Sequence, residues 1–307
     1  VIYNLLHKVL SDGIAAIAVP LFFTMSGYLL FRNVDDYSLD MYIVKLRSRV
    51  RSLLIPYVIW NCFAMMLFWL AQTLLPSLMS SNATLIKDYS LYDFFMAFYD
   101  NGSGGPICYQ FWFLRDLIIL VVISPVIWYA IRFMGRWGIV FFTIVSFASC
   151  SPGIHFIDSV CFFSIGACCG IRKYDVPPFE NWQLIALGIL YLGALGGFLY
   201  TWNWTIRKLM IFIGLGLSIA IASMLVDKNR PVKLMLLNNS SFFIYAYHML
   251  FLVLLVKVSV RMLNPLNDYS AVLLYFVCPT IIIIAGIGIY WALNKCFPQV
   301  AKILTGR

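Results

Sequence analysis

The sequence predicts an all-α membrane protein whose helices cross the bilayer many times. Hydrophobic residues make up 62% of the 307 positions and charged residues only 11%, whereas a soluble domain is about half apolar and a quarter charged. The mean hydropathy is +0.88. One aqueous core cannot bury this much apolar surface, and the apolar residues fall in runs long enough to cross a membrane. We therefore expect a polytopic helical bundle that forms a single transmembrane domain over residues 1–307.

About nine apolar runs have roughly the length, about 20 residues, that a spanning helix needs. The first contains Pro20, Ser26 and Gly27, which a membrane helix tolerates because neighbouring groups satisfy the freed backbone. Such small residues let another helix or a ligand approach closely. The fourth and fifth runs are short. The expected spans are 14–31, 53–75, 111–132, 137–150, 156–171, 184–200, 209–226, 241–260 and 271–293.

Lysine and arginine predict the orientation of these spans. Cytoplasmic loops carry an excess of basic residues, and placing the loop after the first span inside puts the C-terminus inside as well. Nine spans would then leave the N-terminus outside, so we expect one further helix before Val1; a miscounted short span is the alternative. The basic residues placed inside are Arg32, Lys45, Arg47, Arg49, Arg51, Arg132, Arg136, Arg172, Lys173, Lys228, Arg230, Lys233, Lys295, Lys302 and Arg307.

The composition also excludes several classes of function. The net charge of +9 lies in short loops and not on a basic face interleaved with aromatic residues, so nucleic-acid binding is not expected. The eight cysteines show no paired spacing, so neither a metal site nor a disulfide framework is predicted. No Walker loop, dinucleotide fingerprint or serine nucleophile elbow is present.

Two ionisable residues inside apolar runs are candidates for chemistry. Arg115 lies one turn inside the third run, and we expect its neighbour Asp116 to be too close in sequence to share its helical face. Arg115 would then pair with another helix, grip an anionic group or extend to the membrane surface. His248 lies within the eighth run. It is either functional, as buried ionisable groups often are, or a neutral imidazole bonded to Tyr or Ser on a neighbouring helix.

Two further segments carry alternative interpretations. The cluster Lys45, Arg47, Arg49 and Arg51 is either a topology signal or a surface that binds the phosphates of a nucleotide. The outer segment 77–110 contains the aromatic stretch 91–99, which fits an interfacial or re-entrant helix. That helix is either a lid over a site or an ordinary aromatic belt.

Four blocks of the sequence, in this order, resemble the acyltransferase 3 family of bacterial inner-membrane O-acyltransferases. The first two are the stretch Val19-Pro-Leu-Phe-Phe-Thr-Met-Ser-Gly-Tyr28 and the basic segment that ends Leu53-Leu-Ile-Pro-Tyr57. The others are Trp112-Phe-Leu-Arg115 and Ser241-Phe-Phe-Ile-Tyr-Ala-Tyr-His248. Together they extend over nearly the whole chain.

The resemblance implies about ten spans in the inner membrane and transfer of an acyl group to a hydroxyl. The donor would be a cytoplasmic acyl-CoA such as acetyl-CoA, and no cofactor would be bound permanently. The acceptor would be a surface glycan or its lipid-linked precursor. By this resemblance the donor phosphates would be held by Arg47, Arg49 and Arg51. Arg115 and His248 would serve catalysis, with His248 as a polar partner and not the principal base. The substrate would contact Ser26, Tyr57, Trp112 and Tyr245.

The sequence departs from the family pattern in two places. The basic residue and the histidine that the family carries on its first helix are missing, which agrees with the expected extra helix. The arginines of the basic segment are two residues apart and not three. The rival interpretations are a transporter or flippase for lipid-linked sugars, which should show repeat symmetry, and a non-enzymatic scaffold or sensor, which would not need Arg115 and His248.

Overall fold

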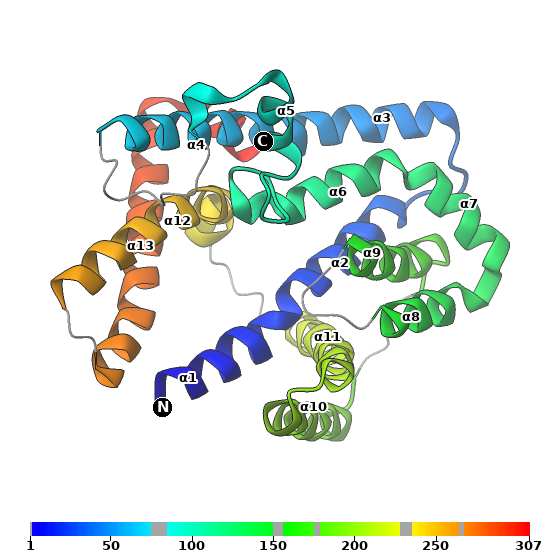
Figure 1. Ribbon diagram of the computed structural model, residues 1–307. Helices are drawn as coiled ribbons and strands as arrows, with labels where there is room; N and C mark the ends of the chain where they lie inside the picture. The colour runs from blue at the N-terminus through cyan, green and yellow to red at the C-terminus, as the bar shows by residue number, and fades with distance from the viewer. Residues whose placement is uncertain (1, 75–84, 150–155, 175–178, 228–234, 264–266) are drawn as a thin grey trace. The chain divides into compact units, whose positions relative to one another are not determined.

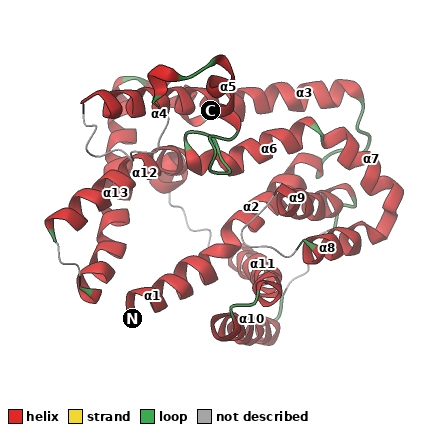
Figure 2. Cartoon of the chain, viewed as in Figure 1, coloured by secondary structure: helices red, strands yellow, loops and turns green. Residues whose placement is uncertain are grey.

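The computed structural model confirms the predicted all-α architecture. It describes residues 2–74, 85–149, 156–174, 179–227, 235–263 and 267–307, and within these ranges the chain forms helices and loops without a strand (Figure 2). The contacts divide the chain into two compact units. Unit 1 comprises Val1–Lys45 and Leu120–Lys233, and unit 2 comprises Leu46–Ile119 and Leu234–Arg307. The single domain expected over 1–307 stays a prediction.

Within the described ranges, seven helical segments are long and apolar enough to cross a membrane, where about nine were predicted. The predicted span 111–132 is divided into α6 (Trp112–Val122) and α7 (Ser124–Met134), because Pro125 lacks an N–H and starts a new helix. Helix α9 (Phe156–Ile171) has only 16 residues. The seven segments are Ile2–Phe31, Leu39–Leu74, Ser124–Ala148, Asn181–Thr201, Trp204–Leu225, Leu237–Met262 and Asp268–Cys296.

The basic segment after the first span is helical and not a loop, which corrects the sequence-based interpretation. Helix α3 (Leu39–Arg49) continues through a π-helical stretch, η3 (Val50–Leu54), into α4 (Ile55–Leu74). Pro56 is the second residue of α4 and follows directly on the π-helical stretch, so the helix changes its hydrogen-bond pattern just before the residue that lacks an N–H. Charged side chains are compatible with this helix because they lie at one end of an apolar run.

Unit 1 is built on helix pairs, of which α2 (Ala18–Phe31) with α9, and α10 (Asn181–Thr201) with α11 (Trp204–Asp227), lie side by side (Figure 1). A continuous helical run leads into α2, and α8 (Gly138–Ala148) packs on α9. The elements that precede these helices are α1 (Ile2–His7), η1 (Lys8–Gly13), η2 (Ile14–Ile17) and η7 (Gly135–Trp137).

Glycines bring the backbones of α2 and α9 together. A methyl group on Gly27 would overlap the Phe163 carbonyl, and one on Gly166 would overlap the Thr24 carbonyl. A methyl group on Gly170 would lie 2.6 Å from the Tyr28 carbonyl of α2, and the spacing of Gly170 from Gly166 is that of the small-residue motif by which membrane helices associate. The close approach that small residues on the first span predict is therefore made by another helix at Gly27.

A buried ion pair joins three helices of unit 1. Lys208 on α11 is 6% exposed and Asp158 on α9 is 3% exposed, and their charged atoms are 2.9 Å apart. The Lys208 ammonium also donates to the carbonyls of Ser146 and Ser149 at the end of α8. Ser146 donates to the same carboxylate at 2.9 Å. The ammonium thus neutralises Asp158 and caps α8 at the same time.

Unit 2 contains α4 with α14 (Pro298–Thr305) and the pair α12 (Met235–Met262) and α13 (Asp268–Cys296). The Trp60 indole donates to the Leu304 carbonyl at 3.1 Å, which fastens α14 to α4. Gly286 of α13 faces Tyr247 of α12. The predicted aromatic helix exists as α5 (Leu91–Tyr99), which begins with a Ser90–Asp93 capping box, and short 3-10 turns η5 (Ile86–Asp88) and η6 (Tyr109–Phe111) flank it.

We expect Gly166→Ala to destabilise the protein by about 1 to 3 kcal/mol, because the added methyl group forces α2 and α9 apart. The matched control is Gly188→Ala on α10, where an added methyl group meets no atom within 4 Å. Thermal unfolding of the two purified variants in detergent compares them directly. Equal melting temperatures would contradict the close backbone contact.

We expect Lys208→Met to cost about 3 to 5 kcal/mol, because it leaves the Asp158 carboxylate buried without its cation. Adding Asp158→Asn to the same chain should recover part of that loss. The exposed Lys302 gives the control Lys302→Met, for which we expect little change. A Lys208→Met variant as stable as the control would show that the ion pair does not hold these helices.

Candidate functional site

The candidate site of unit 2 is organised around the last turn of α5 and the loop that joins it to α6, whose backbone is held by side chains from two helices. Arg115 of α6 donates from Nη1 to the carbonyls of Tyr99, at 2.7 Å, and Gly104, at 3.2 Å. The Tyr57 hydroxyl of α4 donates to the Phe98 carbonyl. Asn61 of α4 accepts from the Cys108 N–H at 3.1 Å. These bonds satisfy backbone groups that an apolar environment would otherwise leave unpaired.

Local sequence explains the shape of this loop. Asp100 Oδ1 accepts from the N–H groups of Gly102, at 3.0 Å, and Gly104, at 2.9 Å. Both glycines have positive φ, +82° and +83°, a region that L side chains rarely adopt. Gly105 lies against Trp112, with which a methyl group at Gly105 would make contact at 3.2 Å. The loop therefore needs its glycines to fold back onto the start of α6.

The sequence-based prediction that Arg115 does not pair with its neighbour Asp116 is wrong. The two side chains form an ion pair, in which Nε and Nη2 of Arg115 both donate to Oδ1 of Asp116, at 3.0 and 2.9 Å. Asp116 is 1% exposed. The long arginine side chain curls back to the adjacent residue, so helical spacing does not separate them. Arg115 also lies over the Tyr99 ring at 5.1 Å, so a carboxylate, two carbonyls and an aromatic ring together hold the arginine.

An aromatic column connects α4, the loop and α12. The Tyr57 and Phe111 rings stack at 5.7 Å, and Phe111 stacks on Tyr245 at 5.6 Å. The Tyr245 hydroxyl donates to the Gln110 carbonyl at 2.6 Å. The structure thus brings Tyr57, Tyr245 and the Arg115 loop together, as a shared site requires.

Gln110 is a candidate that the sequence did not reveal. Its Nε2 donates to the Ala246 carbonyl of α12 at 2.7 Å, which fixes the orientation of the amide. Its Oε1 is buried and has no partner within the part of the chain that the structure describes. A buried acceptor without a donor is costly, and a hydroxyl of a bound molecule would satisfy it. No sequence pattern marks this position, because only the fold places it against α12.

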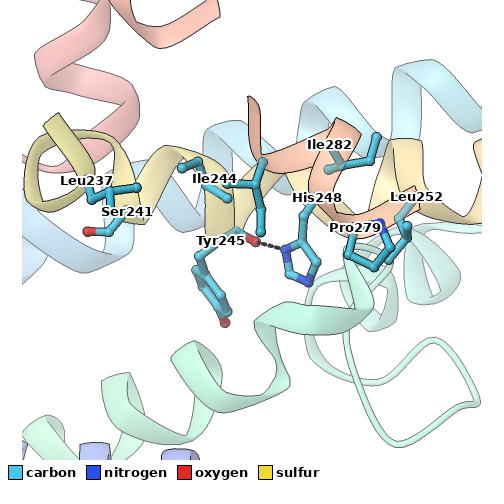
Figure 3. A pocket seen from close by; sticks show the side chains of 9 residues that line it. Leu237, Ser241, Ile244, Tyr245, His248, Leu252, Pro279 and Ile282 are labelled. Carbon is cyan, nitrogen blue, oxygen red and sulfur yellow. Dashed lines mark hydrogen bonds between the residues drawn. The ribbon is translucent and has the colours of Figure 1, made fainter. Parts of the chain in front are cut away.

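His248 lines an apolar pocket of about 430 Å³ between α12 and α13 (Figure 3). Its Nδ1 lies 2.7 Å from the Tyr245 carbonyl of its own helix. A carbonyl only accepts, so Nδ1 carries the proton and a neutral ring presents Nε2 as an acceptor. The partner is therefore a backbone carbonyl of the same helix, and not the Tyr or Ser of a neighbouring helix that one alternative supposed. The other pocket residues are Leu237, Ser241, Ile244, Tyr245, Leu252, Pro279, Ile282 and Ile283.

The remaining predicted residues lie on other elements. Arg47 and Arg51 are one turn apart on the α3–η3 helix of unit 2 and are exposed. Arg49 is half-buried on another face of that helix. Ser26 lies on α2 of unit 1. Cys108, which begins the turn before α6, is buried, and burial raises the pKa of its thiol to about 12, so it stays protonated and is a poor nucleophile at neutral pH.

Comparison with known proteins identifies the class of this protein. The family model described as "Acyltransferase domain" matches residues 1–294. The chain therefore belongs to this acyltransferase family, as its resemblance predicted, and is a multi-pass membrane acyltransferase.

One curated relative is the succinoglycan biosynthesis protein ExoH of Rhizobium meliloti. The two sequences are 26% identical over 318 residues, which cover 98% of this chain and 82% of ExoH. No solved structure matches the chain.

We expect Arg115→Gln to cost several kcal/mol, about 3 to 5, because the buried Asp116 carboxylate loses its cation and two loop carbonyls lose their donor. The double variant Arg115→Gln with Asp116→Asn should regain much of this stability. If Arg115 contacts substrate, acyl transfer stays low in the double variant despite its recovered melting temperature. Recovery of both stability and transfer would restrict Arg115 to a structural role.

Proposed function

We propose that the chain transfers an acyl group, which we take to be acetyl, from cytoplasmic acyl-CoA to a hydroxyl of a cell-surface polysaccharide or its lipid-linked precursor. The observation that carries the proposal is the family match over nearly the whole chain. The relative named for succinoglycan biosynthesis supports a polysaccharide acceptor. The excess of basic residues on one side supports a location in the bacterial inner membrane with a cytoplasmic C-terminus.

The donor would be held by the arginines of the α3–η3 helix. None of Arg47, Arg49 and Arg51 forms an ion pair within the described residues. Arg47 and Arg51 face the same side of their helix because they are four residues apart. Guanidinium groups bind phosphate oxygens through two parallel hydrogen bonds, so this face suits the diphosphate of CoA, with Arg49 on a neighbouring face as a further contact.

The acceptor would bind beside the glycine-rich loop. Trp112 and Tyr245 would supply aromatic surface on which a sugar ring can lie, and the Oε1 of Gln110 would accept from a sugar hydroxyl. Tyr57 is buried and would support this surface through its stack on Phe111. Arg115 would orient the acceptor or stabilise negative charge that develops on the thioester oxygen. His248 would present Nε2 to a substrate hydroxyl as a polar partner. A substrate contact by Ser26, which lies on α2 of unit 1, stays a prediction.

The proposed reaction exchanges one acyl bond for another. The acceptor hydroxyl oxygen attacks the thioester carbonyl carbon, the new ester C–O bond forms and the C–S bond breaks. The hydroxyl proton ends on the CoA thiol. No permanently bound cofactor or metal is needed for this exchange.

The test is acyl transfer by the purified chain in lipid nanodiscs, with labelled acetyl-CoA and a lipid-linked saccharide. We expect Arg47→Gln and Arg51→Gln to raise KM for acetyl-CoA by about 10- to 100-fold each, because each removes a charge-assisted hydrogen bond worth about 1.5 to 3 kcal/mol. Arg261→Gln, at the exposed end of α12, is the control and should leave KM unchanged. Equal KM values in all three variants would remove the donor site from this helix, and active chain that never labels a saccharide would overturn the acceptor class.

A further inference from the structure

We propose that unit 1 contains a phosphate-binding pocket lined by Arg132 and Arg172. The pocket has a volume of about 440 Å³ and is lined by Arg132, Ile171, Arg172 and Tyr174. These residues lie at the ends of α7 and α9. They are distinct from the arginines proposed to hold the acyl donor, and the inference does not depend on that proposed function.

Arg172 supplies the pocket with a buried donor that no described protein atom accepts. Its Nε is buried and has no hydrogen-bond partner among the described residues. A guanidinium has five donors and no acceptor, and leaving a buried charged donor unpaired is unfavourable. An anion in the pocket would provide the missing acceptor.

Gly135 lies beside this guanidinium, at the turn that follows α7. It adopts φ of +61°, and a methyl group placed there would lie 3.7 Å from Nη2 of Arg172. L side chains rarely adopt this backbone conformation. The glycine therefore allows the chain to turn beside the guanidinium of Arg172. The ends of α7 and α9 line the pocket together.

The charge around the pocket is positive because the neighbouring acid is already neutralised. The Asp35 carboxylate accepts from Lys173 Nζ at 2.5 Å, and this contact lowers the pKa of Asp35. Arg132 reaches only the backbone carbonyl of Asp35, at 3.4 Å, and lies over the Trp128 ring at 5.6 Å. The two arginines thus retain their charge for a ligand.

Phosphate is the ligand chemistry that fits two guanidinium groups in a polar pocket. Arginine binds phosphate oxygens in a bidentate manner, and its planar group is positioned by stacking on an aromatic ring. The phosphate could belong to a soluble phosphate ester or to the headgroup of an anionic lipid, since basic pockets at the membrane surface bind both. The experiment separates these two sources.

The full chain is purified in zwitterionic detergent, and its melting temperature is measured with inorganic pyrophosphate. It is then measured in phosphatidylcholine nanodiscs with and without phosphatidylglycerol. We expect one of the two ligands to raise the melting temperature. Arg132→Gln and Arg172→Gln should each weaken this effect, by about tenfold in the ligand concentration required.

Arg136→Gln is the matched control, because Arg136 lies one turn from Arg132, is also exposed and lies over its own Trp137 ring at 5.5 Å, but does not line the pocket. A pyrophosphate effect lost in both pocket variants and kept in the control assigns a soluble phosphate. The same pattern with phosphatidylglycerol alone assigns a lipid headgroup. A response that is absent, or that Arg136→Gln changes equally, overturns the proposal.

A second measurement needs no variant. Phenylglyoxal modifies accessible arginines, and mass spectrometry gives the rate at Arg172 and Arg136 in the unaltered chain. The assigned ligand should slow modification of Arg172 several-fold and leave Arg136 unaffected. Equal rates with and without ligand would overturn the proposal even if the pocket variants fail to fold.

Discussion

The structure depends on one constraint, which is that a polar group surrounded by apolar side chains must find a partner within the protein. Lys208 meets it by bonding Asp158 and the carbonyls that end α8. Arg115 meets it by bonding Asp116 and two loop carbonyls. In both places one cation neutralises a buried carboxylate and also bonds backbone carbonyls. The same side chain therefore balances a buried charge and holds the backbone where a helix ends.

This constraint gives the candidate site its rigidity. Three glycines give the loop between α5 and α6 a flexible backbone. The loop is held because Asn61 from α4 and Arg115 from α6 bond to its backbone, while Tyr57 from α4 bonds to the last turn of α5 before it. Site residues positioned by such contacts keep their geometry without a substrate, and a preorganised arrangement of dipoles is what stabilises a developing charge.

Composition and the length of the apolar runs were enough to predict the fold class, because both report directly on burial in a membrane. They failed where a local detail decides the structure. Pro125 divides one apolar run into two helices, and the basic segment with Arg47 continues as helix because its charges lie at one end of a span. Arg115 was not expected to pair with Asp116, but its long side chain reaches the adjacent residue despite the helical spacing. Gln110 could not be predicted from the sequence as a site residue. Its Oε1 is buried without a described partner only because the fold places Gln110 against α12.

The basic residues of this chain therefore fall into two physical classes. Lys208 is buried and Arg115 is half-buried, and each bonds a buried carboxylate and two backbone carbonyls, so their charge holds the fold together. Arg47, Arg51 and Arg172 each retain donors without a bonded acid within the described residues. Because a charge without a partner is stabilised by any anion that reaches it, it is the incompletely bonded class that should recognise phosphate. The bonded class should instead set the geometry in which acyl transfer takes place.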